Sequence, residues 1–381
     1  MQEIVSSLQI PQSEPYVKYA IAVDWGMLSV YLIVLLIALT AYSAKRSPTK
    51  ANNVALVIPS VADEKVRDSL IMSLNHNRFL NIPIYVVIDE GAPLEGYLKS
   101  LNWIKVVVVP KDYRRDLFGK GRALRYFVEN YVRPDMWYVF LDDDNLVLDD
   151  SFLYEIPYYE RRGFVAFNPI LMPRRGRSYL TFIMDFTRFL DDISFFRLFT
   201  GLVKRPYVGL HGELLGVKGS FLLKSNAFNV PSRVEDYMFA AEVLRLRGHT
   251  WQSRTRVSIL SPNSVKDFIR QRSRWHAGIL ESWKRVPNSM KLMTFIKSFL
   301  RTVGIVGLWV LVPLTHSLLL LLLAAPTSAA YWFVYIYGVR RAGKLRYLLA
   351  VPAFWMLEGF GFIYGILKLR SRDFVVIDKS I

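Results

Sequence analysis

The rest of the chain is arranged around Phe140-Leu141-Asp142-Asp143-Asp144-Asn145, whose three acids follow the apolar run Trp137–Leu141. That run has the length and composition of a buried strand, so three carboxylates stand at the carboxyl end of the strand. Open α/β sheets bind their ligands at this edge. We therefore expect the acids to face a ligand. An Asp-rich solvated turn is the alternative, because Asp favours turns and is usually exposed.

A metal ion would remove the repulsion within this acidic cluster. Alternate residues of an extended segment point the same way, so Asp142 and Asp144 can share one cation. Hard divalent ions take one or two carboxylates together with substrate phosphates and water. The spacing thus suggests a divalent metal site for a phosphate-bearing ligand.

Apolar strands alternate with amphipathic helices before this stretch. Val- and Ile-rich runs predict the strands Val54–Pro59, Ile84–Asp89, Ile104–Pro110 and Trp137–Leu141, and helical spacing predicts the helices Glu64–Leu74 and Lys120–Tyr131. This order predicts an α/β fold with a doubly wound, Rossmann-like sheet and right-handed crossovers, which is an architecture that binds nucleotides.

Two further features of this half suit a nucleoside diphosphate. Asp89 ends the second predicted strand and can reach a base or ribose, although an acid there can equally cap the next turn. Gly119-Lys120-Gly121-Arg122 opens a helix. Its glycines let the backbone approach a ligand, and the helix N-terminus with Lys120 favours an anion such as a diphosphate. Each signal is weak alone.

Three segments in the middle of the chain leave alternatives open. Pro173–Ser178 is a basic loop, expected to be mobile, that either closes on phosphates or lipid head groups or is simply solvated. Thr181–Phe199 is apolar on one side and acidic on the other, which suits a helix at a membrane interface or a core helix. Gly212–Ser220 predicts a strand interrupted by glycines, where something approaches the backbone closely.

Two later motifs carry candidate chemistry. Glu235 and Asp236 begin an amphipathic helix, where the helix dipole favours acids and where a carboxylate can act as a general base. Gln271, Arg274 and Trp275 share one helix face at positions i, i+3 and i+4. This face presents an amide, a cation and an aromatic plate, which suit a diphosphate and a sugar ring. An interfacial helix with a Trp anchor is the alternative.

The composition indicates a membrane partner and excludes some metal sites. The chain has 381 residues, is 52% hydrophobic and 14% aromatic, and carries a formal charge of +17. This richness suggests membrane segments, and the charge suits basic flanks on an anionic leaflet. No nucleic-acid module is present, so we expect no nucleic-acid partner. Cysteine is absent, so a metal must use oxygen or imidazole ligands.

Hydrophobic stretches predict membrane helices on both sides of the α/β region. Residues 25–44 are apolar and precede Lys45 and Arg46, so the positive-inside rule places the N-terminus outside and the following domain in the cytoplasm.

The C-terminal part contains further hydrophobic stretches. Thr302–Ala325 and Leu345–Leu367 are each long enough to span, whereas Ser328–Val339 is short. We expect two crossings here, with three as the alternative. Glu358 lies within an apolar stretch, so it must face a partner, a cavity or water. It is a candidate contact for a polar acceptor, and a structural hydrogen bond is equally consistent.

In this order, the motifs resemble those of the inverting family 2 glycosyltransferases of the cellulose synthase and hyaluronan synthase group, especially the small members related to egghead-type β-mannosyltransferases. The resemblance covers about residues 50–290. It rests on the Asp89 strand end, the Asp142–Asp144 cluster, the Glu235-Asp236 pair and Gln271–Trp275, which matches Gln-x-x-Arg-Trp. It implies a GT-A catalytic domain.

The resemblance also implies roles for individual residues. Asp142 and Asp144 would hold Mg²⁺ or Mn²⁺ against the donor diphosphate, and Asp236 would be the catalytic base. The residues implied for the donor are Pro59, Asp89, Lys120, Asp143, Gln271 and Arg274, and those implied for the acceptor are Glu235, Trp275, Gly219 and Ser220.

The expected organisation places one catalytic domain between membrane segments. Its parts are an extracytoplasmic segment 1–24, a transmembrane helix 25–44, the cytoplasmic GT-A domain 50–262, interfacial helices 263–300, a transmembrane region 301–368 and a tail 369–381.

The implied function is inverting, metal-dependent transfer of a hexose, with mannose from GDP-mannose favoured, to a lipid-linked (polyprenyl- or dolichyl-type) glycan at the cytoplasmic membrane face. The hydrophobic stretches are too few for the closed channel of the large synthases, which argues against processive synthesis. The alternatives are a polyprenyl-phosphate mannose synthase, a processive polysaccharide synthase using a UDP-sugar, and an inactive nucleotide-sugar-binding scaffold.

Overall fold

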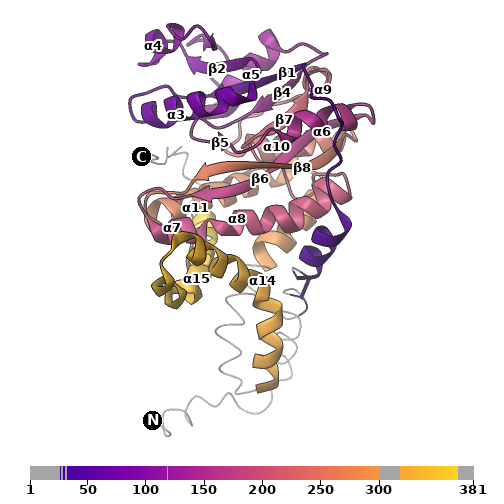
Figure 1. The fold of residues 1–381 in the computed structure, drawn as a ribbon, viewed down its shortest axis with the longest axis vertical. Coiled ribbons are helices and arrows are strands. Elements are labelled where there is room, and N and C mark those ends of the chain that lie inside the picture. Colours follow the sequence, from indigo (N-terminus) through magenta and orange to yellow (C-terminus); the bar gives the residue numbers. More distant parts are fainter. Residues whose placement is uncertain (1–25, 27–28, 31, 118, 301–317, 368–381) are drawn as a thin grey trace.

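The computed structural model describes residues 26, 29–30, 32–117, 119–300 and 318–367. In these residues, a mixed eight-stranded sheet has the order β3-β2-β1-β4-β7-β6-β8-β5 (Figure 1). The strands are β1 (Val54–Pro59), β2 (Ile84–Asp89), β3 (Lys105–Val109), β4 (Trp137–Phe140), β5 (Leu146–Val147), β6 (Phe164–Arg174), β7 (Leu215–Lys218) and β8 (His249–Leu260). The predicted α/β class is confirmed.

The parallel half of the sheet follows the predicted pattern closely. β3, β2, β1 and β4 pair in parallel, so their carboxyl ends lie at one edge. β1 and β2 have the predicted bounds, and β3 stops before Pro110, which has no N–H to donate to a ladder. The helix α3 (Arg67–Asn77) starts later than predicted, because Asp63 Oδ1 accepts from the N–H groups of Lys65 and Val66 and holds a turn there.

Alternate residues of β1 divide the core into two layers. Val54, Leu56 and Ile58 pack with the helices α3, α4 (Glu95–Lys99) and α6 (Ser151–Glu160). Ala55 and Val57 point to the other face, where the helices α5 (Gly119–Tyr131), α9 (Gly219–Lys224) and α10 (Glu235–Arg245) lie. Both faces of the strand are therefore apolar, as expected for a strand buried between two helical layers.

The central strand β7 depends on one glycine. Gly216 lies between β4 and β6 and faces Phe167 across the ladder. A Cβ atom on Gly216 would lie 1.9 Å from the Phe167 ring, which is fully buried. The predicted glycine-interrupted strand Gly212–Ser220 is thus a shorter strand, and at its centre a neighbouring strand approaches closely.

A second helical layer lies beneath the sheet and is continuous with the last helices (Figure 1). It contains α7 (Tyr179–Met184), α8 (Phe186–Asp191), the π-helix η2 (Asp192–Leu202), α11 (Val265–Glu281), α14 (Leu318–Ala342) and α15 (Val351–Leu367). Asp185 and Asp192 are fully buried. For Thr181–Phe199, the structure therefore agrees with the core-helix alternative rather than an interfacial helix with an exposed acidic face.

A buried arginine joins these helices. Arg272 Nη2 lies 2.9 Å from Asp185 Oδ1, and Arg272 Nε lies 3.3 Å from Glu358 Oε2 on α15. Thr187 also donates to Glu358 at 3.0 Å. Of the two possibilities for Glu358, the structural hydrogen bond is the one observed, because a buried guanidinium requires neutralisation.

The basic loop Pro173–Ser178 is tied down at several points. Gly176 packs against Ser261 O and the Asn263 side chain, and Arg177 N donates to Asn263 Oδ1 at 3.1 Å. The Arg175 Cζ atom lies 4.4 Å from the centroid of the Tyr179 ring. These contacts hold the loop in the described conformation, and the mobility that the sequence suggests stays a prediction.

The helices near the C-terminus differ from their predicted bounds. Among the residues described, no helix combines the length and hydropathy needed to cross a membrane. Ser328–Val339, expected to stand apart, is part of the longer helix α14, and a 3₁₀ segment at Leu345–Ala350 precedes α15. The expected segments 1–24 and 369–381, and residues 302–317, lie outside the described residues. The transmembrane helices therefore remain predictions.

Replacing Gly216 should expose the packing constraint on β7. We expect Gly216→Ala to lower the free energy of unfolding by about 3 kcal/mol, because the buried Phe167 ring cannot move away without disturbing both neighbouring strands. The measurement is thermal or denaturant unfolding of the full chain, followed by tryptophan fluorescence. Gly96→Ala is the matched control, because a Cβ there meets nothing within 4 Å and Ala favours a helix over Gly. Equal stability of the two variants would contradict the assignment.

Candidate active site

A cleft of about 420 Å³ opens at the carboxyl edge of the parallel strands, a volume suited to a small-molecule ligand. Most of the predicted site residues line it, namely Pro59, Asp89, Lys120, Asp142, Asp143, Glu235, Asp236, Gln271, Arg274 and Trp275. These residues come from β1, β2, α5, the end of β4, α10 and α11, so the fold brings together motifs that are far apart in the sequence.

The acidic stretch after β4 divides between the cleft and the interior. Asp142 pairs with Lys120, and Asp143 accepts a 2.5 Å hydrogen bond from Ser60 Oγ. Asp144 is only 1% exposed and does not line the cleft. Arg174 donates to its main-chain oxygen at 2.8 Å. Asp142 and Asp143 thus line the cleft and Asp144 is buried beside them, and the metal-binding role expected for Asp144 stays a prediction.

Gly219 and Ser220 do not reach this cleft. β7 runs antiparallel to β4, so Lys218 pairs with Trp137 at the start of β4, at the far end from Asp142. A Cβ on Gly219 would lie 1.9 Å from the Arg133 carbonyl oxygen. The close approach predicted at this glycine is thus to the chain's own backbone, which corrects the acceptor-binding role expected for Gly219 and Ser220.

Asp89 lies at the outer end of the cleft. Its carboxylate pairs with Arg122, which also donates to the Pro110 carbonyl. The Asp89 side chain is 60% exposed, so it remains open to a ligand. Its predicted contact with a nucleoside is compatible with this place.

Lys120 supplies a positive charge at the centre of the cleft. Its Nζ pairs with Asp142 and lies 3.7 Å from Glu235 Oε1. Burial disfavours its charge, but Asp142 and Glu235 outweigh burial and raise the pKa of the ammonium above its ordinary value. Lys120 therefore stays charged and can face a diphosphate.

The two acids at the start of α10 differ in their surroundings. Asp236 Oδ2 accepts from Gly212 N at 2.9 Å, and its Oδ1 accepts from Tyr237 N at 2.7 Å. Burial, opposed by Lys120, raises the pKa of Glu235 to about 7, and the charge of Asp236 adds to the rise. Burial likewise raises the pKa of Asp236, and Lys120 opposes this rise. Asp236 is thus an oriented carboxylate with increased proton affinity, as a general base requires.

The helix α11 places Gln271, Arg274 and Trp275 on the cleft, as their spacing predicts. Sequence reasoning missed the role of Arg272 behind them. Its Nη1 donates to Gln271 Oε1 at 3.0 Å, and its Cζ lies 4.6 Å from the Trp275 ring centroid. Arg272 therefore supports both residues from the interior, and no local pattern could reveal its partners Asp185 and Glu358.

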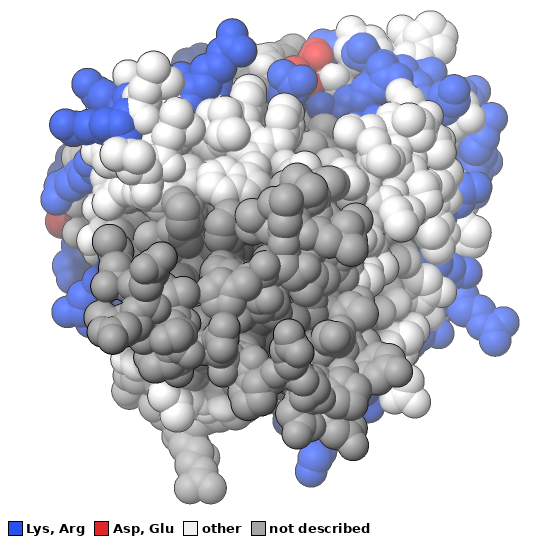
Figure 2. Space-filling model, turned by 90° about the horizontal axis from the view of Figure 1, so that it is seen from below, with Lys and Arg blue, Asp and Glu red and all other residues white. Residues whose placement is uncertain are grey.

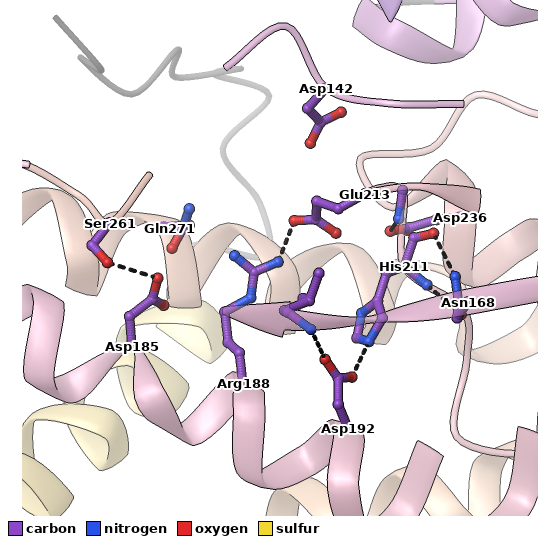
Figure 3. A network of polar contacts seen from close by, with 12 residues as sticks. Asp142, Asn168, Asp185, Arg188, Asp192, His211, Glu213, Asp236, Ser261 and Gln271 are labelled. Atoms are coloured by element: carbon purple, nitrogen blue, oxygen red, sulfur yellow. Dashed lines mark hydrogen bonds and ion pairs between the residues drawn. The ribbon is translucent and has the colours of Figure 1, made fainter. Parts of the chain in front are cut away.

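A second polar network, also missed, lies on the side of the cleft shown in Figure 3. Arg188 on α8 pairs with Glu213, and its Cζ lies 5.0 Å from the Trp275 ring centroid. His211 Nε2 lies 2.5 Å from Asp192 Oδ1. Gly212 and Glu213 stand before β7 in the sequence, but their partners lie on other elements. Glu213 pairs with Arg188 on α8, and Gly212 N donates to Asp236 on α10.

The donor atoms in the cleft suit a hard divalent metal. The described part of the chain holds no group of three His, Cys, Asp or Glu side chains with metal-binding geometry. Mg²⁺ and Mn²⁺ need fewer protein ligands, because water and substrate phosphates complete their coordination. Asp142 and Asp143 offer oxygen ligands at the cleft wall, so the residues present fit such an ion bound together with a diphosphate.

Comparison with known proteins agrees with this geometry. The family model "Glycosyl transferase family group 2" matches residues 137–362, more than half of the chain. The β-1,4-mannosyltransferase egh of Drosophila melanogaster is 26% identical over 347 residues, covering 79% of this chain and 71% of its own length. The β-1,4-mannosyltransferase bre-3 of Caenorhabditis elegans is 24% identical over 319 residues, covering 73% and 68%.

A solved structure also shares the fold. The mannosyltransferase PcManGT from Pyrobaculum calidifontis, in complex with GDP-Man and Mn²⁺, aligns with a TM-score of 0.58 at 13% identity and covers 94% of this chain and 99% of its own. The family match and the shared fold confirm the predicted family and its enzymatic class. The chain belongs to glycosyl transferase family group 2 and is a glycosyltransferase with a GT-A-type α/β core.

Proposed function

We propose that this chain is an inverting mannosyltransferase that uses GDP-mannose, with Mn²⁺ or Mg²⁺, and a lipid-linked glycan acceptor. The observation that carries the proposal is the convergence of Asp142, Lys120, Asp236 and Trp275 in one cleft. Mannose is favoured because the relatives egh and bre-3 are β-1,4-mannosyltransferases and PcManGT binds GDP-Man.

The donor half of the cleft stabilises a leaving diphosphate. Lys120 and Arg274 place two cations where the negative charge develops. Asp142 and Asp143 would hold the divalent ion, which when bound supplies further positive charge to the diphosphate. Asp89, which is exposed, and Pro59 line the same cleft, where the nucleoside would bind.

The acceptor half provides the base. Asp236 is fixed by two backbone N–H groups, so its orientation does not depend on the ligand. It takes the proton of the acceptor hydroxyl as the oxygen attacks the anomeric carbon, and the bond to the diphosphate breaks on the opposite side. A single displacement inverts the anomeric centre and gives a β product from an α-linked donor.

The cytoplasmic membrane face is the proposed location, with the N-terminus outside. Figure 2 shows Lys and Arg side chains around the edge of the molecule's lower face and few acids among them. The helix α14 extends toward this face (Figure 1). Lys and Arg side chains gathered in this way suit a surface of anionic lipids.

A polyprenyl-phosphate mannose synthase is the second candidate. It shares the fold but lacks the Gln-x-x-Arg-Trp motif, which here lines the cleft through Gln271, Arg274 and Trp275. The other two alternatives have less support. A processive synthase would need more hydrophobic stretches for its closed channel, and an inactive scaffold has no use for the oriented Asp236.

Removing divalent metal should abolish transfer. We expect EDTA to stop the transfer of labelled mannose from GDP-mannose into membrane lipid, and Mn²⁺ or Mg²⁺ to restore it. Asp142→Asn should raise the Mn²⁺ concentration for half-maximal rate by at least about tenfold, because one anionic ligand is lost. Full activity in metal-free buffer would contradict the proposal, and a panel of UDP-sugars tests the choice of donor.

Replacing the base should separate chemistry from binding. Asp236→Asn keeps an oxygen that can accept from Gly212 N but cannot take a proton. We expect kcat to fall by about 10²–10⁴-fold, with the affinity for GDP and Mn²⁺, measured by calorimetry, little changed. Asp112→Asn, at an exposed position outside the cleft, is the control. Unchanged turnover in the Asp236 variant would remove the base assignment.

Glu235 should make stability depend on pH in a defined window. Its pKa rises from the usual 4.5 to about 7 in the fold, so between these values the folded chain keeps a proton that the unfolded chain releases. The free energy of unfolding therefore falls as the pH rises through this window, by up to about 3 kcal/mol.

Glu235→Gln should remove this fall in the free energy of unfolding. The difference in stability between the variant and the parent should therefore shift in favour of the variant when the pH is raised from 4.5 to 8. The measurement is denaturant unfolding at several pH values in EDTA. Glu64→Gln, whose side chain is 63% exposed, serves as control. Parallel stability curves for the parent and the Glu235 variant would contradict the assignment.

A further inference from the structure

The Glu213 carboxylate is a polar group of the cleft that the proposed mechanism does not use. It lies in the segment before β7, lines the cleft and is 13% exposed. Figure 3 shows it directed at the Arg188 guanidinium, with which it forms an ion pair. Burial favours protonation of Glu213, but Arg188, His211 and Lys120 outweigh burial and hold its pKa well below the ordinary value. Glu213 is therefore an anion that can only accept hydrogen bonds.

Arg188 connects this carboxylate to the aromatic plate of the site. The guanidinium pairs with Glu213, and its Cζ lies 5.0 Å from the Trp275 ring centroid. An ionised carboxylate beside an indole is a pairing suited to sugars, because the carboxylate accepts from hydroxyls and the ring contacts C–H groups. Arg188 fixes the distance between the two.

The neighbours of Glu213 tie it to the proposed base. Gly212 N, in the preceding residue, donates to Asp236 Oδ2 at 2.9 Å. His211 is held on both sides, by Asp192 through its ring and by Asn168 Oδ1, which accepts from His211 N at 3.0 Å. This clamped segment keeps Glu213 and Asp236 in a fixed relation, so a sugar bound at Glu213 would hold one hydroxyl in a constant place relative to the base.

We propose that Glu213 is a substrate-contacting residue that accepts hydrogen bonds from the hydroxyls of the acceptor's terminal sugar, with Arg188 as its positioning residue and Trp275 as the adjoining plate. The proposal rests on the proposed function and narrows the acceptor to an uncharged glycoside. In the step, the acceptor oxygen loses its proton to Asp236 and bonds to the anomeric carbon. The bond from that carbon to the diphosphate oxygen breaks, and its electron pair leaves with the diphosphate. Glu213 keeps its charge throughout.

The same charges argue against a phosphate acceptor. A polyprenyl phosphate would bring its negative charge between Glu213 and Asp236, and like charges in a partly buried site repel strongly. Arg188 cannot compensate this charge fully, because it is already paired with Glu213, and in the proposed mechanism Lys120 faces the donor diphosphate. A neutral sugar hydroxyl meets no such cost.

The test compares two acceptors with a Glu213→Gln variant of the full chain in lipid nanodiscs free of glycoside detergent. The probes are an alkyl mannoside or alkyl glucoside and farnesyl phosphate, with labelled GDP-mannose as donor. We expect the parent to transfer mannose to an alkyl glycoside faster than to farnesyl phosphate. In Glu213→Gln, the acceptor KM should rise by about tenfold or more, since hydrogen bonds to charged groups are strong, while the donor KM changes less than twofold.

The controls separate binding from folding. Glu242→Gln breaks another Glu–Arg pair, to Arg245, that lies outside the cleft, and should leave both KM values unchanged. Because Glu213→Gln leaves the Arg188 charge uncompensated, the double variant Arg188→Met with Glu213→Gln removes both charges together. The double variant should unfold at a temperature close to that of the parent. It should show the same rise in the KM for the alkyl glycoside as Glu213→Gln.

Several outcomes would overturn the proposal. A rise confined to the donor KM would assign Glu213 to the donor sugar instead, and unchanged acceptor KM in both Glu213 variants would show a purely structural pair. Preference of the parent for farnesyl phosphate would overturn the acceptor class. If the parent transfers no mannose, the proposed function fails, and calorimetric binding of the alkyl glycosides to parent and variant still decides whether Glu213 binds a sugar.

Discussion

The ammonium of Lys120, set between the carboxylates of Asp142 and Glu235, is the interaction on which the cleft depends. The carboxyl edge of the sheet gathers acids from the end of β4 and from α10, and without a cation their repulsion would push these elements apart. Lys120 comes from the first turn of α5, so this helix is held against the acidic edge. A site built in this way suits the diphosphate leaving group and the metal ion of the proposed reaction.

A second charge balance supports the site from below. Arg272 is buried between Asp185 and Glu358, and its guanidinium also contacts Gln271 and Trp275. The cleft-facing residues of α11 therefore depend on contacts with α7 and α15, two elements far away in the sequence. A Cβ atom on Gly361 would lie 2.7 Å from the Arg272 Cβ, so the observed packing of α15 against α11 requires a glycine at this position.

The two sides of the cleft have different roles in the proposed reaction. In the proposed reaction, the Lys120 side of the cleft binds the diphosphate and its metal ion. The Arg188–Glu213–Trp275 side addresses shape and hydroxyl groups, as a sugar requires. Asp236 lies where the two meet, fixed by Gly212 N. This arrangement suits the proposed anionic donor and uncharged acceptor, in adjacent parts of one cleft.

Local sequence patterns were sufficient to predict the parallel half of the sheet, because strands buried on both faces leave continuous Val- and Ile-rich runs such as Val54–Pro59. They also predicted the face Gln271, Arg274 and Trp275, since helical spacing is a local property. The burial of Asp144, the position of Gly219 at the far end of β7 and the pairing of Glu213 with Arg188 became visible only in the folded chain. These outcomes depend on strand direction and on contacts between distant segments, and no periodicity within a short stretch encodes either.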